Sequence, residues 1–122
     1  MRILLVEDDP LNVELFTAVL EDDGHQVAVE RDGETGKARA LRDAFDLLIL
    51  DIQLPRLRGD AVCRAVRTAG LTTPIIGLSA EALPEQISAN GAAGFDLYLT
   101  KPIQPAELRA AVRQYRPVEK RT

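Results

Sequence analysis

Three short segments of the chain are apolar throughout, without the polar alternation of a half-exposed strand. They are Ile3–Val6, Leu47–Leu50 and Ile75–Leu78. A strand that packs on one face alternates apolar and polar residues, whereas a strand buried on both faces is continuously apolar. These segments therefore predict the central strands of a parallel sheet that is covered on both sides.

Two further β-rich segments complete a set of five, and one of them, near residue 26, is expected to be an edge strand. With flanking residues included, the predicted strands are Ile3–Val6, Gln26–Val29, Asp46–Leu50, Pro74–Leu78 and Phe95–Leu99. Each is bounded by charged residues, glycine or proline, which is typical of strand ends.

Stretches with helical spacing separate and follow these strands. The first helix is opened by Asp9-Pro10, a capping residue followed by proline. The second ends near Asp43, and the third is stopped by Gly70. The predicted apolar faces are Leu11, Leu15, Ala18 and Val19; Ala38 and Leu41; Ala61, Val62, Ala65, Val66 and Ala69; Leu83, Ile87 and Ala92, opened by Pro84; and Leu108, Ala111, Val112 and Tyr115, opened by Pro105 and ended before Pro117.

Strand and helix thus alternate five times with short connections, and such crossovers are right-handed in nearly all sheets. We predict an α/β fold in which a doubly wound, five-stranded parallel sheet carries helices on both faces. A closed eight-unit barrel would need about twice the 122 residues of this chain. The length fits one domain.

Composition narrows the functional classes. No apolar run is long enough to span a membrane, so no membrane association is expected. The net charge of −4 gives no overall attraction to nucleic acid. The single cysteine excludes a disulfide framework and a cysteine zinc site. It also suits a reducing compartment, and we expect a cytoplasmic protein.

Chemically active residues follow four of the predicted strands. Sites in open α/β sheets lie beyond the carboxyl ends of the strands, where this chain places Glu7, Asp8, Asp51, Ser79 and Lys101. Clustered carboxylates without histidine or cysteine favour Mg²⁺. A carboxylate beside Mg²⁺ and a lysine can attack phosphorus and form an aspartyl phosphate. Each residue taken alone also fits a cap, a loop or a solvated side chain, so only their joint placement supports a site.

Five motifs carry a resemblance over about residues 2–115. They are Ile3-Leu4-Leu5-Val6-Glu7-Asp8-Asp9; Leu48-Ile49-Leu50-Asp51-Ile52-Gln53-Leu54-Pro55 with Gly59; Ile76-Gly77-Leu78-Ser79-Ala80; Gly91-Ala92 with Gly94; and Tyr98-Leu99-Thr100-Lys101-Pro102-Ile103. In this order and spacing they resemble the receiver domain of bacterial two-component response regulators. The resemblance implies a flavodoxin-like strand order 2-1-3-4-5, with a receiver domain over residues 1–116 and a tail or linker over 117–122.

The resemblance also implies a role for each site residue. Asp51 is the expected phospho-acceptor, and Mg²⁺, which Mn²⁺ can replace, is the expected cofactor. The expected metal ligands are Glu7, Asp8, Asp51 and the backbone carbonyl of Gln53. Lys101 is expected to pair with the phosphoryl group, Ser79 and Tyr98 are expected to act as the switch, and the Lys101–Pro102 bond is expected to be cis.

The implied function is a phosphorelay switch. The phosphoryl donor is a histidine kinase or a histidine phosphotransfer protein, and the responding surface lies on helix 4, strand 5 and helix 5, where a homodimer can also form. As an isolated domain the chain is expected to catalyse only its own phosphorylation and dephosphorylation. Parts of the sequence also look like receivers of hybrid sensor histidine kinases.

Three alternatives stay open at this point. One is a degenerate receiver that acts only as an interaction module. Another is a phosphatase with an aspartate nucleophile, which would need a second acid where Gln53 stands. A flavodoxin-like electron carrier is the third, although acids rather than hydroxyls follow the first strand. The basic Arg56-Leu57-Arg58 departs from the family pattern, and the sequence assigns it no role.

Overall fold

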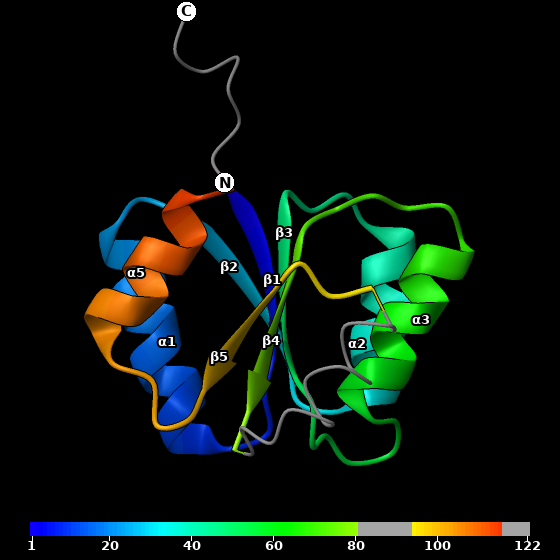
Figure 1. Ribbon diagram of the computed structural model, residues 1–122, viewed down its shortest axis with the longest axis horizontal. Coiled ribbons are helices and arrows are strands. Elements are labelled where there is room, and N and C mark those ends of the chain that lie inside the picture. Colours follow the sequence, from blue (N-terminus) through cyan, green and yellow to red (C-terminus); the bar gives the residue numbers. More distant parts are fainter. Residues whose placement is uncertain (81–93, 116–122) are drawn as a thin grey trace, which may run out of the picture.

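Five parallel strands form a single sheet in the order β2-β1-β3-β4-β5 (Figure 1). The computed structural model describes residues 1–80 and 94–115. The strands are β1 (Arg2–Val6), β2 (Gln26–Glu30), β3 (Leu47–Asp51), β4 (Ile75–Ser79) and β5 (Leu97–Thr100). The predicted α/β class, the parallel sheet and the strand order are confirmed.

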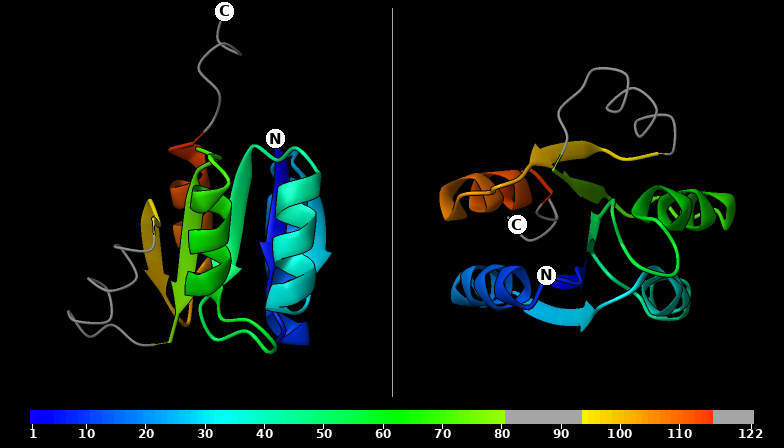
Figure 2. Two further views of the ribbon diagram at one scale, coloured as in Figure 1. Left: turned by 90° about the vertical axis from the view of Figure 1, so that its right-hand side faces the viewer. Right: turned by 90° about the horizontal axis from the view of Figure 1, so that it is seen from below.

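Helices cover both faces of this sheet (Figures 1 and 2). Helices α1 (Pro10–Asp22) and α5 (Pro105–Arg113) lie on one face, and α2 (Gly33–Arg42) and α3 (Gly59–Thr68) lie on the other. Alternate residues of β1 enter two separate cores: Ile3 and Leu5 pack on the α1–α5 side, and Leu4 and Val6 on the α2–α3 side. Burial on both faces therefore explains the continuously apolar segments.

Most predicted strand ends lie one residue from the observed ones, and the start of β5 and the end of α5 differ by more. Strand β5 begins at Leu97 rather than Phe95, because Asp96 occupies the approach to it: its backbone N–H donates to the carbonyl of Ile75 and its carboxylate accepts from the N–H of Ile75. Helix α5 ends at Arg113, before the predicted end, because the next two N–H groups donate to carbonyls three residues back and tighten the turn.

The predicted apolar faces of the first two helices are also wrong, except for Val19 of the first helix, which is buried as predicted. Helix α1 buries Val13, Phe16, Val19 and Leu20, while Leu11, Leu15 and Ala18 are exposed. Helix α2 buries Gly33, Gly36 and Ala40, while Ala38 and Leu41 are exposed. A side chain at Gly36 would collide with Val6, so α2 contacts β1 through small residues rather than through large apolar ones.

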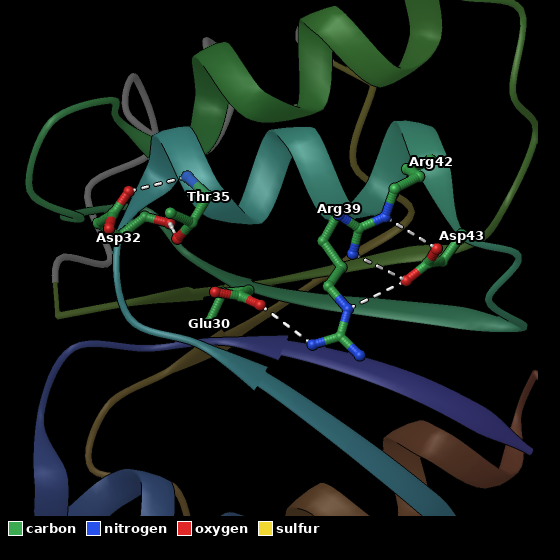
Figure 3. Close-up of polar contacts among 6 residues, drawn as sticks. All are labelled: Glu30, Asp32, Thr35, Arg39, Arg42 and Asp43. Carbon is green, nitrogen blue, oxygen red and sulfur yellow. Dashed lines mark hydrogen bonds and ion pairs between the residues drawn. The ribbon is translucent and has the colours of Figure 1, made fainter.

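An ion-pair network holds α2 against the end of β2 (Figure 3). Arg39 lies 3.1 Å from Glu30 of β2 and 3.1 Å from Asp43, the C-terminal capping residue of α2. Arg42 makes a further pair with Asp43. At the other end of the helix, the Asp32 carboxylate accepts the N–H of Thr35 and caps the first turn.

The predicted fourth helix, with Leu83, Pro84, Ile87 and Ala92, lies outside the described residues, as does the tail 117–122. Within the described ranges, no helix has the length and apolar character needed to cross a membrane.

Candidate functional site

Three acidic side chains meet where β1 and β3 end. The two strands are neighbours, with Val6 paired to Leu50, so the residues that follow come together at one edge of the sheet. Glu7, Asp8 and Asp51 each offer a carboxylate oxygen, and these oxygens lie within 4.8 Å of one another. Glu7 and Asp51 are buried, whereas Asp8 is exposed to solvent. The carboxylate cluster therefore consists of two buried acids and one exposed acid at its opening.

Lys101 reaches this carboxylate cluster from the end of β5, the edge strand of the sheet. Its Nζ lies 2.9 Å from Oδ2 of Asp51 and 3.0 Å from Oε2 of Glu7. The backbone N–H of Lys101 donates to the carbonyl of Ser79, which ties the residue to the end of β4. The Lys101–Pro102 peptide bond is cis, the conformation expected at this position.

The charge balance of the site acts most strongly on Glu7. Burial, together with the neighbouring negative charge of Asp51, raises the pKa of Glu7 to about 7, although Lys101 pulls in the opposite direction. Burial alone would lower the pKa of Lys101, but its contacts with Asp51 and Glu7 outweigh that effect and raise it. One ammonium thus does not fully neutralise the acids that surround it.

The donor set fits a hard divalent cation. Oε2 of Glu7 is buried, and its 3.0 Å ion pair with Lys101 Nζ lacks hydrogen-bond geometry, so this oxygen keeps coordinating capacity to spare. Carboxylate oxygens are the ligands that Mg²⁺ prefers, and one acid at the mouth leaves room for the waters that Mg²⁺ keeps. The residues Glu7, Asp8 and Asp51 therefore have the chemistry and the placement of a magnesium site.

The predicted Gln53, Ser79 and Tyr98 take different positions around this centre. The N–H of Gln53 donates to Oδ1 of Asp51 at 3.1 Å, which fixes the carboxylate and places the Gln53 backbone beside it. Ser79 is buried at the end of β4. The ring of Tyr98 is not at the carboxylate cluster but on the α3 side of β5, against Phe95.

The loop from Ile52 to Arg58 closes tightly behind Asp51. Gly59 donates its N–H to the carbonyl of Ile52, and a side chain at Gly59 would collide with the backbone carbonyl of Asp51. Arg56 has φ +70°, and the N–H of Leu57 donates to the carbonyl of Pro55, which is a γ-turn. This strained turn directs the exposed Arg56 away from the core.

One feature beside the site was missed from the sequence. Leu11 and Leu15 were assigned to the core, yet their exposed fractions are 75% and 41%. They stand one turn apart on the first half of α1, directly after the acids that follow β1. A face through Val13, Phe16 and Leu20 has equally good helical spacing and includes the aromatic Phe16, and this is the signal that could have identified the core face.

Comparison with known proteins adds a family to this geometry. The family model described as the response regulator receiver domain matches residues 3–113. The transcriptional regulatory protein DltR of Streptococcus agalactiae is 42% identical over 114 residues, which are 93% of this chain and 50% of DltR. The chain thus spans about half the length of that curated relative.

Solved structures agree in fold. The receiver domain of the Francisella response regulator 1452 has a TM-score of 0.89 and 27% identity, covering 93% of this chain and 94% of that one. The receiver domain of the sensor histidine kinase PA1611 of Pseudomonas aeruginosa has a TM-score of 0.86 and 35% identity, covering 93% and 95%. That crystal structure has a magnesium ion coordinated in its active-site cleft.

Proposed function

The chain belongs to the response regulator receiver domain family, and on that basis we propose that Asp51 accepts a phosphoryl group from a phosphohistidine. The donor is a histidine kinase or a histidine phosphotransfer protein. The observation that carries this proposal is the contact between Lys101 and Asp51, with 2.9 Å between Nζ and Oδ2, inside a cluster of acids. A carboxylate held beside a cation in this way is suited to bind an incoming phosphoryl group.

In the proposed transfer, a carboxylate oxygen of Asp51 attacks phosphorus, a P–O bond forms, and the P–N bond to the donor histidine breaks. The electron pair of that bond leaves with the imidazole. Lys101 pairs with the phosphoryl oxygens, and the N–H of Gln53 keeps the Asp51 carboxylate oriented. Glu7, Asp8, Asp51 and the Gln53 carbonyl would hold Mg²⁺, which would supply positive charge to neutralise the phosphoryl oxygens. Mn²⁺ offers similar chemistry.

The phosphoryl group then acts as a switch. It adds negative charge and hydrogen-bond acceptors beside Ser79, which is buried at the end of the neighbouring strand β4. Ser79 moves toward the phosphoryl group, Tyr98 follows, and the populations of two conformations change. The surface formed by helix 4, β5 and α5 is the proposed output surface and the proposed homodimer contact.

A protein donor needs an apolar contact surface near Asp51. Leu11 and Leu15 supply exposed apolar side chains on the first half of α1, the helix that follows Asp8 in the chain. We therefore place donor docking on α1. The isolated domain catalyses only its own phosphorylation and dephosphorylation, in the cytoplasm, without binding nucleic acid directly.

Acetyl phosphate with Mg²⁺ tests the proposed acceptor. Mass spectrometry of the intact protein should show one added phosphoryl group in the wild type and none in Asp51→Asn. Asp43→Asn is the matched control, because it removes an acid from the α2 network and should be labelled like the wild type. Equal labelling of wild type and Asp51→Asn would overturn the assignment.

A wild-type chain that takes no phosphoryl group from acetyl phosphate or from a phosphorylated histidine phosphotransfer protein would contradict the whole proposal. It would favour a receiver that works only as an interaction module. A test of α1 docking uses Leu11→Ser, which should lose transfer from the protein donor and keep labelling by acetyl phosphate.

A further inference from the structure

Gly77 lies at the centre of β4, directly beside the aromatic ring of Tyr98. The two residues are register partners in neighbouring strands. A Cβ added at Gly77 would lie 2.8 Å from Cε1 of Tyr98 and 2.9 Å from Cδ1 of Phe95, closer than packed carbon atoms approach. The missing side chain of Gly77 therefore creates the space that the Tyr98 ring fills.

The direction of the Tyr98 ring follows from the pleat of β5. Leu97 and Leu99 pack on the α1–α5 core, so Tyr98 between them faces the α3 side. There its ring meets Phe95, with 5.0 Å between centroids and a tilt of 44°. Burial raises the pKa of the Tyr98 phenol, and the nearby Cys63 and Asp60 of α3 add to the rise. The ring thus passes over β4 toward α3.

Among the described residues, no hydrogen bond accounts for this inward position. The Tyr98 hydroxyl is buried and makes no hydrogen bond to any described residue. A buried hydroxyl without a partner disfavours the conformation that buries it. Packing therefore holds the ring, and in the part of the chain that the structure describes its ring contacts are with Gly77 and Phe95.

We propose that Gly77 is a positioning residue that holds Tyr98 in its inward conformation, by leaving the space that its ring occupies. In the unphosphorylated protein the side chain of Tyr98 then already points inward. The backbone of β4, rather than Ser79, determines this resting conformation. The consequence for signalling depends on the proposed function, whereas the steric relation between Gly77 and Tyr98 does not.

The experiment uses Gly77→Ala, whose methyl group takes the space of the ring. The chain has two tyrosines and no tryptophan, so Tyr115→Phe leaves Tyr98 as the single tyrosine. Labelled with 3-fluorotyrosine, this background gives one ¹⁹F signal. In Gly77→Ala the signal should move toward that of the free amino acid. Acrylamide quenching of unlabelled Tyr98 fluorescence should rise severalfold, and the phenol should titrate closer to its usual pKa of about 10.

Controls separate displacement from general loosening. Ile76→Val trims the neighbouring residue of β4, which faces the other core, and should leave the Tyr98 signal unchanged. Gly77→Ala combined with Phe95→Leu relieves the contact with Phe95, and serves also if Gly77→Ala alone does not fold. A displaced Tyr98 signal in the double variant supports the proposal. A wild-type Tyr98 signal, either in the double variant or in folded Gly77→Ala, overturns the proposal.

The two proposals fail in different ways. Asp51→Asn should keep the inward Tyr98 signal, because Gly77 is intact. Failure to phosphorylate Asp51 would remove the proposed function and leave the ¹⁹F result standing. A Tyr98 signal that is displaced in unphosphorylated wild type and moves inward only with acetyl phosphate and Mg²⁺ would overturn the role of Gly77 and leave the proposed function intact.

Discussion

Two clusters of charged side chains, both at the ends of strands, differ in how their charges balance. On α2, two arginines, Arg39 and Arg42, face two acids, Glu30 and Asp43, and all four remain partly open to solvent (Figure 3). At the ends of β1 and β3, by contrast, three acids share the single ammonium of Lys101 among the described residues, and two of the acids are buried.

The imbalance of charge is what distinguishes the proposed functional cluster from the α2 network. The α2 pairs lower the pKa of Asp43 and raise that of Arg39, so each partner favours the charged form of the other. In the carboxylate cluster the pKa of Glu7 rises to about 7, because burial and Asp51 disfavour its charged form. Excess negative charge held in a buried place is a site prepared for a cation.

Among variants that keep the acceptor Asp51, the one that removes the exposed acid of the carboxylate cluster should have the largest effect. Asp8→Ala takes away a proposed metal ligand, and the Mg²⁺-dependent rate of labelling by acetyl phosphate should fall about 100-fold, since a bound metal contributes several kcal/mol to such a reaction. Titration calorimetry should show Mg²⁺ binding lost in parallel. Asp43→Asn provides the control, with rate and binding close to wild type.

Unchanged Mg²⁺ affinity in Asp8→Ala would place the metal elsewhere. Unchanged labelling together with lost affinity would show that transfer does not need the metal. Either result would remove the parallel between charge imbalance and function in this molecule.

Replacing the cation of each cluster sharpens the contrast. Lys101→Met removes the ammonium that contacts Asp51, and labelling by acetyl phosphate should fall about 10-fold, the effect of losing roughly 1.4 kcal/mol of electrostatic stabilisation. Arg39→Met removes a guanidinium with two ion pairs and should leave the rate unchanged. Initial rates on phosphate-affinity gels measure both. Equal losses in the two variants would point to general destabilisation.

Much of this contrast could be predicted from the sequence. The continuously apolar segments predict the central strands. Because the ends of parallel strands meet at one edge of the sheet, Glu7, Asp8, Asp51 and Lys101 could be grouped from the sequence alone. The Asp9 cap of α1 is likewise local, and its side chain accepts the N–H of Leu11 as expected.

Features that depend on the fit between elements could not be predicted. The faces of α1 and α2 were assigned by counting apolar residues, but α2 packs through Gly33 and Gly36, whose lack of a side chain gives no periodic signal. The space over Gly77 depends on a ring from the neighbouring strand. Tertiary packing decides these positions, and the spacing of apolar residues along the sequence carries no information about that packing.

The raised pKa of Glu7 predicts a smaller effect, on stability. Between pH 4.5 and 7 the folded protein holds a proton on Glu7 that the unfolded chain has released, so stability falls as the pH rises through this window. In EDTA, the free energy of unfolding should be about 2 kcal/mol greater at pH 5.0 than at pH 7.5 from this group. Denaturant melts of wild type and Glu7→Gln measure the difference.

Asp43→Asn is the control for that slope. Because the pKa of Asp43 is lowered, its contribution to stability is present at pH values above its usual pKa of 3.8 and is lost only at more acidic pH. Added Mg²⁺ should flatten the slope, since a bound cation favours ionised Glu7. The same pH dependence in wild type and Glu7→Gln would show that another group carries the proton.

The smallest effect is expected for the α2 network. Partly exposed ion pairs are screened by salt and lose side-chain entropy when they form, so they add little to stability. Arg39→Met should therefore leave the midpoint of urea unfolding nearly unchanged, and raising the salt concentration should reduce even that difference. In metal-free Lys101→Met, by contrast, the pH window of Glu7 should extend upward, because the cation that lowers its pKa is gone. A large, salt-sensitive loss in Arg39→Met would mean that balanced charge also stabilises this fold, and imbalance would then no longer separate the two clusters.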